Sequence, residues 1–274
     1  MHPMPDAADR PDDLPSPRAP WPYPLWLAHR GAGRLAPENT LAALRVGAAH
    51  GWRAFEVDVK LSADGLPFLL HDDSFDRTTD AAGSAGELNW ADVARLDAGS
   101  WHSRHYAGEP PASLEAVAAF CLRNGLQLNL ELKPVPGDEP RTGAVVARCV
   151  RQLWGAAVHA GQATWPLLSS FSPEALAAAR ETEAELPRAL LLDRFWTDWL
   201  PVAERLECRA IGLHHALIDA ALMQRLDADD LRVLAYTVND AAEAERLLEL
   251  GVDSLVSDAI ELFCPALGAE QSLP

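Results

Sequence analysis

The sequence contains few basic residues for its size. Lys and Arg number 23 against 40 Asp and Glu, so the 274-residue chain carries a formal net charge of −17 at pH 7. A field of this sign repels polyanions, and we therefore expect neither nucleic acid nor an anionic membrane surface as a partner. If the substrate is an anion, cations close to the site must attract it, because the field of the whole chain opposes its approach.

Cysteine is scarce as well. The four cysteines are far apart, form no CxxC pair and lie in or just after apolar stretches; they are Cys121, Cys149, Cys208 and Cys264. In such surroundings cysteine behaves as a small hydrophobic residue. The spacing therefore predicts no disulfide framework.

Long apolar runs are also missing. Residues 1–24 are rich in Pro, Asp and Ala and lack the apolar core of a signal peptide, and no stretch approaches the length of a membrane span. We therefore expect a cytoplasmic protein without stable membrane association, whose residues 1–23 form a disordered tail. The sequence leaves the oligomeric state open, and a homo-oligomer is compatible with it.

Beyond this tail, strand-like and helix-like segments alternate. Strands are predicted within 24–31 and over 54–60, 67–70, 127–133, 166–171, 188–192, 210–214, 232–238 and 253–257. Helices are predicted over 41–50, 113–124, 142–159, 173–185, 196–206, 219–226 and 240–250, with a last one from residue 259. Such alternation indicates parallel strands joined by helices.

About eight strand–helix units of this kind predict an α/β fold over residues 24–274, a closed (β/α)8 TIM barrel. An open doubly wound sheet is the alternative, but no GxGxxG motif follows the first strand. Residues 72–112 break the rhythm with several glycines and one short helix over 89–96. Because long irregular stretches in compact domains tend to be functional, we expect a small inserted subdomain after strand 2.

The predicted strand over 54–60 has an unusual inner face. Glu56, Asp58 and Lys60 share one face, and apolar residues share the other, because side chains alternate along a strand. Two carboxylates on a buried face would repel each other and lose hydration. A hard divalent cation such as Mg²⁺ or Ca²⁺ binds oxygen ligands and removes this penalty. A solvated amphipathic edge strand is the simpler alternative.

Other polar side chains lie near the carboxyl ends of the predicted strands, where a (β/α)8 barrel carries its chemistry. They are His29 and Arg30 after the first strand, His71 after 67–70, and Asn129, Glu131 and Lys133 along 127–133. Each of them alone could be an ordinary structural residue. Chance would seldom place two histidines, three carboxylates, an arginine and a lysine at one rim.

Short motifs surround these residues. They are His29-Arg30-Gly31, Pro37-Glu38-Asn39-Thr40, Glu56-Val57-Asp58, His71-Asp72-Asp73 with Arg77-Thr78, Leu130-Glu131-Leu132-Lys133-Pro134, Ser170-Phe171-Ser172-Pro173, Tyr236-Thr237-Val238-Asn239 and Ser257-Asp258. Together these motifs resemble the glycerophosphodiester phosphodiesterase family over about residues 24–264. The stretches 86–90 and 97–101 are similar to its cytosolic bacterial branch.

The resemblance implies a TIM barrel with a subdomain inserted after strand 2. It also implies metal-dependent hydrolysis of small glycerophosphodiesters to sn-glycerol 3-phosphate and an alcohol, with Mg²⁺ or Ca²⁺ as cofactor. The implied roles fall on seven residues: the metal ligands Glu56, Asp58 and Glu131, the general acid/base pair His29 and His71, and the phosphate contacts Arg30 and Lys133.

The chemistry of these residue types agrees with the implied reaction. A phosphodiester is an anion, and its transition state gains negative charge that a divalent ion, Arg30 and Lys133 can stabilise. The attacking oxygen loses a proton and the leaving alcohol gains one, and histidine titrates in the range that suits both transfers. The sequence leaves open which of His29 and His71 is the base, whether water or the substrate's glycerol hydroxyl attacks, and which alcohol is preferred.

Three other functions are compatible with these residues. A lysophospholipase D or sphingomyelinase D-like enzyme has a similar His-Arg, Glu-x-Asp and His arrangement, and Trp90, Trp101, Trp196 and Trp199 could contribute to an apolar groove. A metal-assisted lyase or isomerase could use Lys133, because barrels host many reactions. A barrel without activity could simply bind phosphorylated ligands.

Overall fold

The computed structural model describes residues 20–263. Cys264 and residues 1–19 of the predicted tail lie outside this range. The last residues of that tail pack against the barrel: Trp21 donates a hydrogen bond through its indole N–H to the Ser254 hydroxyl (3.0 Å), and the buried Tyr23 donates through its hydroxyl to the Trp165 carbonyl (2.9 Å). These two aromatic rings bury apolar surface, so they belong with the folded domain.

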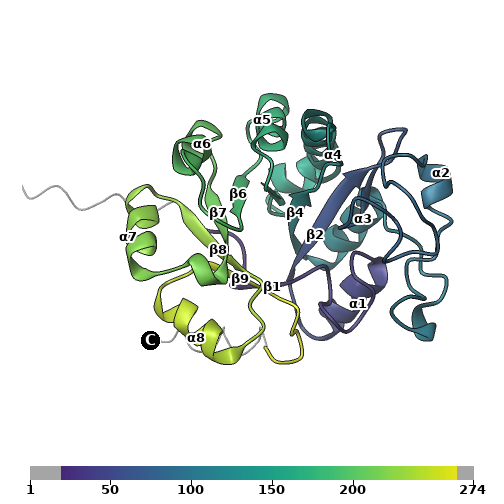
Figure 1. The fold of residues 1–274 in the computed structure, drawn as a ribbon, viewed down its shortest axis with the longest axis horizontal. Helices are drawn as coiled ribbons and strands as arrows, with labels where there is room; N and C mark the ends of the chain where they lie inside the picture. Colours follow the sequence, from purple (N-terminus) through teal and green to yellow (C-terminus); the bar gives the residue numbers. More distant parts are fainter. Residues whose placement is uncertain (1–19, 264–274) are drawn as a thin grey trace, which may run out of the picture.

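Eight parallel strands form a closed barrel, as predicted (Figure 1). They are β1 (Trp26–Ala28), β2 (Ala54–Leu61), β4 (Gln127–Leu132), β5 (Leu167–Ser170), β6 (Arg188–Leu192), β7 (Ala210–His214), β8 (Arg232–Tyr236) and β9 (Ser254–Ser257). Strand β1 closes the ring, because it pairs in parallel with both β2 and β9. The predicted (β/α)8 fold is therefore confirmed.

Helices surround the barrel (Figure 1). They are α1 (Leu41–Ala49), α3 (Leu114–Asn124), α4 (Glu139–His159), α5 (Pro173–Thr182), α6 (Trp199–Arg205), α7 (Ala220–Ala228) and α8 (Ala241–Glu249). Side chains cap several of their amino ends; Thr40, for instance, accepts a hydrogen bond from the Ala43 amide. Of the helix predicted from residue 259, the structure describes only residues 259–263, of which 260–262 form a turn, and the remainder lies outside the described residues.

Strand β2 separates the core from the site. Its eight residues are all buried. Phe55, Val57 and Val59 pack in the main hydrophobic core, and Glu56 and Asp58 face the opposite side. The period of two predicted from the sequence therefore holds, and it brings charged groups into the barrel interior.

The inserted subdomain begins on β3 (Pro67–Leu69), which pairs antiparallel with β2. The segment that follows contains the short helix α2 (Trp90–Val93) and lies to one side of the barrel, at the right of Figure 1. It has a small hydrophobic cluster of its own, made by Phe68, Leu70, Phe75, Ala85 and Val93. This cluster gives the excursion enough apolar contact to hold its shape beside the barrel.

Three of the four cysteines lie within the described residues. Cys121, Cys149 and Cys208 are free thiols there, and the sequence predicted no disulfide framework. Among residues 20–263, no helix has both the length and the apolar character needed to cross a membrane.

Helices α4 and α5 approach each other closely at Gly143. A Cβ atom added there would lie 2.0 Å from the Ala175 carbonyl oxygen, whereas one added at Gly155 of the same helix would meet no atom closer than 3.7 Å. We expect Gly143→Ala to lower the free energy of unfolding by about 1–3 kcal/mol through overpacking. Gly155→Ala should raise it by about 0.5–1 kcal/mol, because alanine favours a helix. Urea unfolding of both variants checks this, and equal effects of the two would contradict it.

Candidate active site

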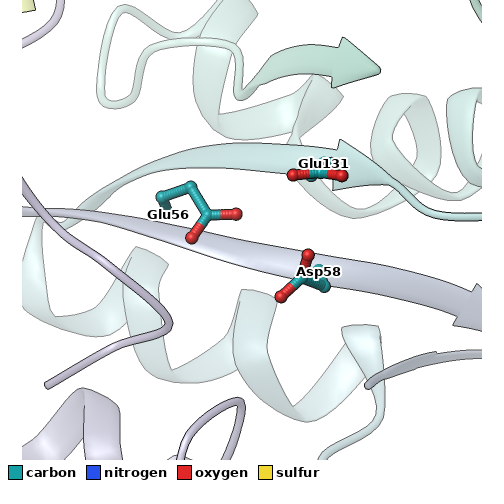
Figure 2. A group of neighbouring side chains, drawn as sticks. All are labelled: Glu56, Asp58 and Glu131. Carbon is teal, nitrogen blue, oxygen red and sulfur yellow. The ribbon is translucent and has the colours of Figure 1, made fainter. Parts of the chain in front are cut away.

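Three carboxylates lie together at the carboxyl end of the barrel. Glu56 and Asp58 extend from β2 and Glu131 from the neighbouring β4, where Asp58 and Glu131 are register partners (Figure 2). One oxygen of each lies within 4.8 Å of the others, and all three side chains are buried. Among the described residues this is the only such group of His, Cys, Asp and Glu side chains.

The carboxylates influence one another strongly. Burial, followed by the nearby Asp58 charge, raises the pKa of Glu56 to about 8, and the same two causes raise the pKa of Glu131. Burial would also raise the pKa of Asp58, but the charges of Lys133 and Arg30 outweigh it and lower that pKa. Glu56 Oε1 is buried without a hydrogen-bond partner. Three close oxygen donors with an unpartnered atom fit a hard divalent cation.

Asn39 fixes the central carboxylate. Its side-chain amide donates to Asp58 Oδ2 (2.8 Å), and its Oδ1 accepts from the Asp58 backbone amide (3.0 Å). Asn39 has a positive φ of 58°, a conformation that asparagine tolerates better than most residues. Asn39 and Thr40 both stand just before α1, and either residue type can cap a helix. Thr40 is the cap, and Asn39 instead orients Asp58.

His29 follows β1 and faces the carboxylates from one side. Its Nδ1 lies 2.5 Å from Asp258 Oδ1, and its Nε2 lies 3.7 Å from Glu56 Oε2. Asn239 in turn holds Asp258 through two hydrogen bonds. Burial would lower the pKa of His29, but its hydrogen bond to Asp258 and the Glu56 charge raise it.

His71 follows β3 and has a matching arrangement. Its Nδ1 lies 2.7 Å from Asp72 Oδ1, and its Nε2 lies 3.0 Å from Lys133 Nζ. Burial lowers the pKa of His71. Each histidine is therefore held at Nδ1 by a carboxylate and directs Nε2 toward other groups of the site.

Two cations flank the carboxylates. The backbone amide of Arg30 donates to Glu56 Oε2 (3.1 Å), and the Nε atom of the Arg30 side chain lies 3.6 Å from Asp58 Oδ2. Lys133 Nζ forms an ion pair with Glu131 Oε1 (2.9 Å) and lies 3.7 Å from Asp58 Oδ1. Behind it, the fully buried Lys60 donates to the Lys133 carbonyl oxygen (2.9 Å) and so holds the chain that carries this lysine.

Several hollows open around the site. A cavity of about 40 Å³ inside the barrel is lined by His29, Glu56, Asn129, Glu131 and apolar residues including Phe171 and Tyr236. A groove of about 310 Å³ lies beside Lys133 and Phe171, and another hollow of about 400 Å³ lies beside His29, Arg30 and Trp101. The site is therefore accessible from both sides of the carboxylates.

All seven residues predicted from the sequence lie at this end of the barrel; they are His29, Arg30, Glu56, Asp58, His71, Glu131 and Lys133. The sequence reasoning did not identify the residues that orient them: Glu38, Asn39, Asp72 and Asp258. All four occur in the motifs quoted above. Asp258 directly follows β9, and a polar residue at a strand's carboxyl end was the available signal.

The sequence model described as the glycerophosphoryl diester phosphodiesterase family matches residues 29–262. The chain belongs to this family. The match includes all seven predicted site residues, and the predicted family, its fold and its phosphodiesterase class are thereby confirmed.

Individual members of the glycerophosphoryl diester phosphodiesterase family resemble the chain along most of its length. A Bacillus subtilis (strain 168) glycerophosphodiester phosphodiesterase is 28% identical over 256 residues, which cover 87% of this chain and 85% of the relative. An Oleispira antarctica phosphodiesterase, solved in complex with the product sn-glycerol-3-phosphate, superposes with a TM-score of 0.80 at 32% identity, covering 91% of this chain and 97% of its own. A glycerophosphodiester phosphodiesterase from Agrobacterium tumefaciens superposes with a TM-score of 0.72 at 26% identity, covering 88% of this chain and 99% of its own.

The role of Asn39 can be separated from its backbone conformation. Glycine accepts a positive φ, so Asn39→Gly removes the amide and leaves the turn unstrained. We expect Mg²⁺ or Ca²⁺ to bind about 10–100-fold more weakly, because Asp58 loses the partner that orients it. Isothermal titration calorimetry of wild type and variant measures this, and an unchanged Kd would show that Asp58 holds its orientation alone.

Proposed function

We propose that this chain hydrolyses glycerophosphodiesters to sn-glycerol 3-phosphate and an alcohol, with a divalent cation and with His29 and His71 as general acid/base pair. The observation that carries the proposal is the buried carboxylate group, Glu56, Asp58 and Glu131, with a carboxylate-held histidine on either side. The related Oleispira antarctica phosphodiesterase binds sn-glycerol-3-phosphate, which supports the same product here.

The three carboxylates are the residues that would hold the cation. Their burial, their closeness and the unpartnered Glu56 oxygen suit a hard ion with oxygen ligands. When bound, such an ion supplies positive charge beside the phosphoryl oxygens, where negative charge develops in the transition state. Mg²⁺ and Ca²⁺ both fit this donor set, and titration with each decides between them.

Arg30 and Lys133 supply fixed positive charge on either side of the carboxylates. Arg30 presents a planar guanidinium that suits two phosphate oxygens, and its Nε is buried without a hydrogen-bond partner. Lys133 acts as a point charge at the opening of the groove beside Phe171. These local cations attract an anionic substrate despite the negative charge of the whole chain.

The two histidines transfer the protons. One takes the proton of the attacking oxygen, and the other gives a proton to the leaving alcohol, so both protons are accounted for. Asp258 and Asp72 hold the Nδ1 atoms, which leaves each Nε2 directed to the reacting groups. Assays for a cyclic glycerophosphate intermediate separate attack by the substrate's own hydroxyl from attack by water.

A lysophospholipid is the second candidate substrate, because aromatic side chains are exposed around the strand ends. Trp101 and Phe171 line two of the hollows and are 40% and 42% exposed, and Phe195 and Trp196 after β6 are exposed as well. Choline release from lysophosphatidylcholine at a rate rivalling that from glycerophosphocholine would favour it.

The cytoplasmic location and the lack of stable membrane association stay predictions.

Metal dependence is tested with glycerophosphocholine as substrate. We expect EDTA to abolish release of sn-glycerol 3-phosphate, Mg²⁺ or Ca²⁺ to restore it, and Glu56→Gln to remove it, because the amide has lost the charge that binds the cation. Glu87→Gln, a surface carboxylate of the inserted subdomain, is the matched control. Full activity of Glu56→Gln in the presence of EDTA would rule out the metal site.

The histidine assignment is tested by His29→Ala and His71→Ala. We expect each to lower kcat by about 10²–10⁴-fold, since each removes one proton transfer. The exposed His50→Ala should leave kcat unchanged. Rates within a few-fold of wild type for both active-site variants would refute the acid/base assignment.

A further inference from the structure

Arg77 lies in the inserted subdomain. Among the described residues, it forms no hydrogen bond or ion pair with Glu56, Asp58 or Glu131. Its guanidinium nevertheless makes four hydrogen bonds. It donates to both oxygens of Asp72 (2.7 and 2.9 Å) and to both oxygens of Glu38 (2.8 and 2.7 Å). A single arginine therefore joins two carboxylates by paired hydrogen bonds, the strongest geometry that such groups form.

Each of these two carboxylates holds a residue of the proposed reaction. Asp72 lies 2.7 Å from His71 Nδ1, and Glu38 accepts a hydrogen bond from Arg30 Nη1 (2.8 Å). Arg77 is thus joined through Asp72 to His71, a proposed proton-transfer residue. It is joined through Glu38 to Arg30, a proposed phosphate contact.

The contacts close into a ring of polar and charged groups around the site. In order, its members are Arg30, Glu38, Arg77, Asp72, His71, Lys133 and Asp58, which returns to Arg30. Arg77, like Asp72, comes from the segment that follows β3, whereas Arg30 and Lys133 follow barrel strands. Without Arg77, Asp72 and Glu38 would each lose their second cationic or hydrogen-bonded neighbour.

The orientation of His71 depends on this ring. Lys133 Nζ carries only donors, so at 3.0 Å it donates to His71 Nε2, and the ring proton stands on Nδ1 and is donated to Asp72. A carboxylate that is free to rotate would hold neither this tautomer nor the plane of the ring. Because Arg77 grips both Asp72 oxygens, that carboxylate has one orientation.

We propose that Arg77 is a positioning residue, which fixes Asp72 and thereby the tautomer and plane of His71, and which also holds Glu38 against Arg30. The proposal rests on the function proposed above, in which His71 transfers a proton. The competing explanation is that Arg77 only stabilises its own loop, as an exposed ion pair does weakly.

The test compares Arg77→Ala with Arg95→Ala, a matched arginine of the same subdomain that has only one distant ion pair, 3.7 Å from Asp92. We expect Arg77→Ala to lower kcat by about 10²-fold, because misplacing a reacting group has effects of this size. The urea unfolding midpoint should change little, and Arg95→Ala should change neither quantity.

Two further readouts separate positioning from loop stability. Arg77 is 44% exposed, so free guanidinium at millimolar concentration can reach the space left by Arg77→Ala, and we expect it to restore kcat at least tenfold over equal ionic strength of NaCl. In the ¹⁵N spectrum of the His71 ring, assigned with His71→Gln, we expect one tautomer in wild type and a mixture in Arg77→Ala.

The outcomes are distinct. A kcat within twofold of wild type, a His71 spectrum unchanged by Arg77→Ala, or a lost kcat that follows a lost unfolding midpoint would each overturn the proposal. If wild type turns over no glycerophosphodiester, the proposed function fails instead, and the His71 ring spectrum still decides whether Arg77 positions this residue.

Discussion

Electrostatic repulsion among three buried carboxylates is the constraint on which the rest of the site depends. Glu56, Asp58 and Glu131 lie too close to one another and too far from water to be charged together without compensation. Arg30 and Lys133 provide part of it, and they favour the charged form of Asp58 most. The pKa values of Glu56 and Glu131 stay raised, so the two cations leave compensation that a bound cation could supply.

The compensating groups come from different parts of the fold. The loop after β1 supplies Arg30, the end of β4 leads to Lys133, and the inserted subdomain supplies Arg77 behind Asp72. The subdomain has a small core of its own, which helps to hold the segment that carries Arg77 beside the barrel. A segment that reads as irregular in sequence is thus tied to the site by hydrogen bonds.

Much of this architecture could be predicted from the sequence, because the signals were local. Alternation of side chains along β2 indicated which face carries Glu56 and Asp58, and the alternation of strands with helices indicated a barrel. Carboxylates on a buried strand are costly enough that they stand out without any structure.

The parts that could not be predicted depend on contacts between distant segments. Asp258 meets His29 only because β9 pairs with β1, and a pairing that closes a barrel leaves no local pattern. Asn39 is a residue type that often caps a helix. It forms a hydrogen bond with Asp58 only because the start of α1 lies beside β2. Residues 20–24 are at least as rich in proline as the tail before them, yet the rings of Trp21 and Tyr23 contact the barrel through hydrogen bonds.

The pairing of His29 with Asp258 also has a consequence during synthesis of the chain. The two residues are 229 positions apart, so when the ribosome has made the carboxylate group and seven of the eight barrel strands, His29 still lacks its carboxylate partner. The nascent chain therefore acquires a complete pair of oriented histidines only when β9 has emerged and joined β1.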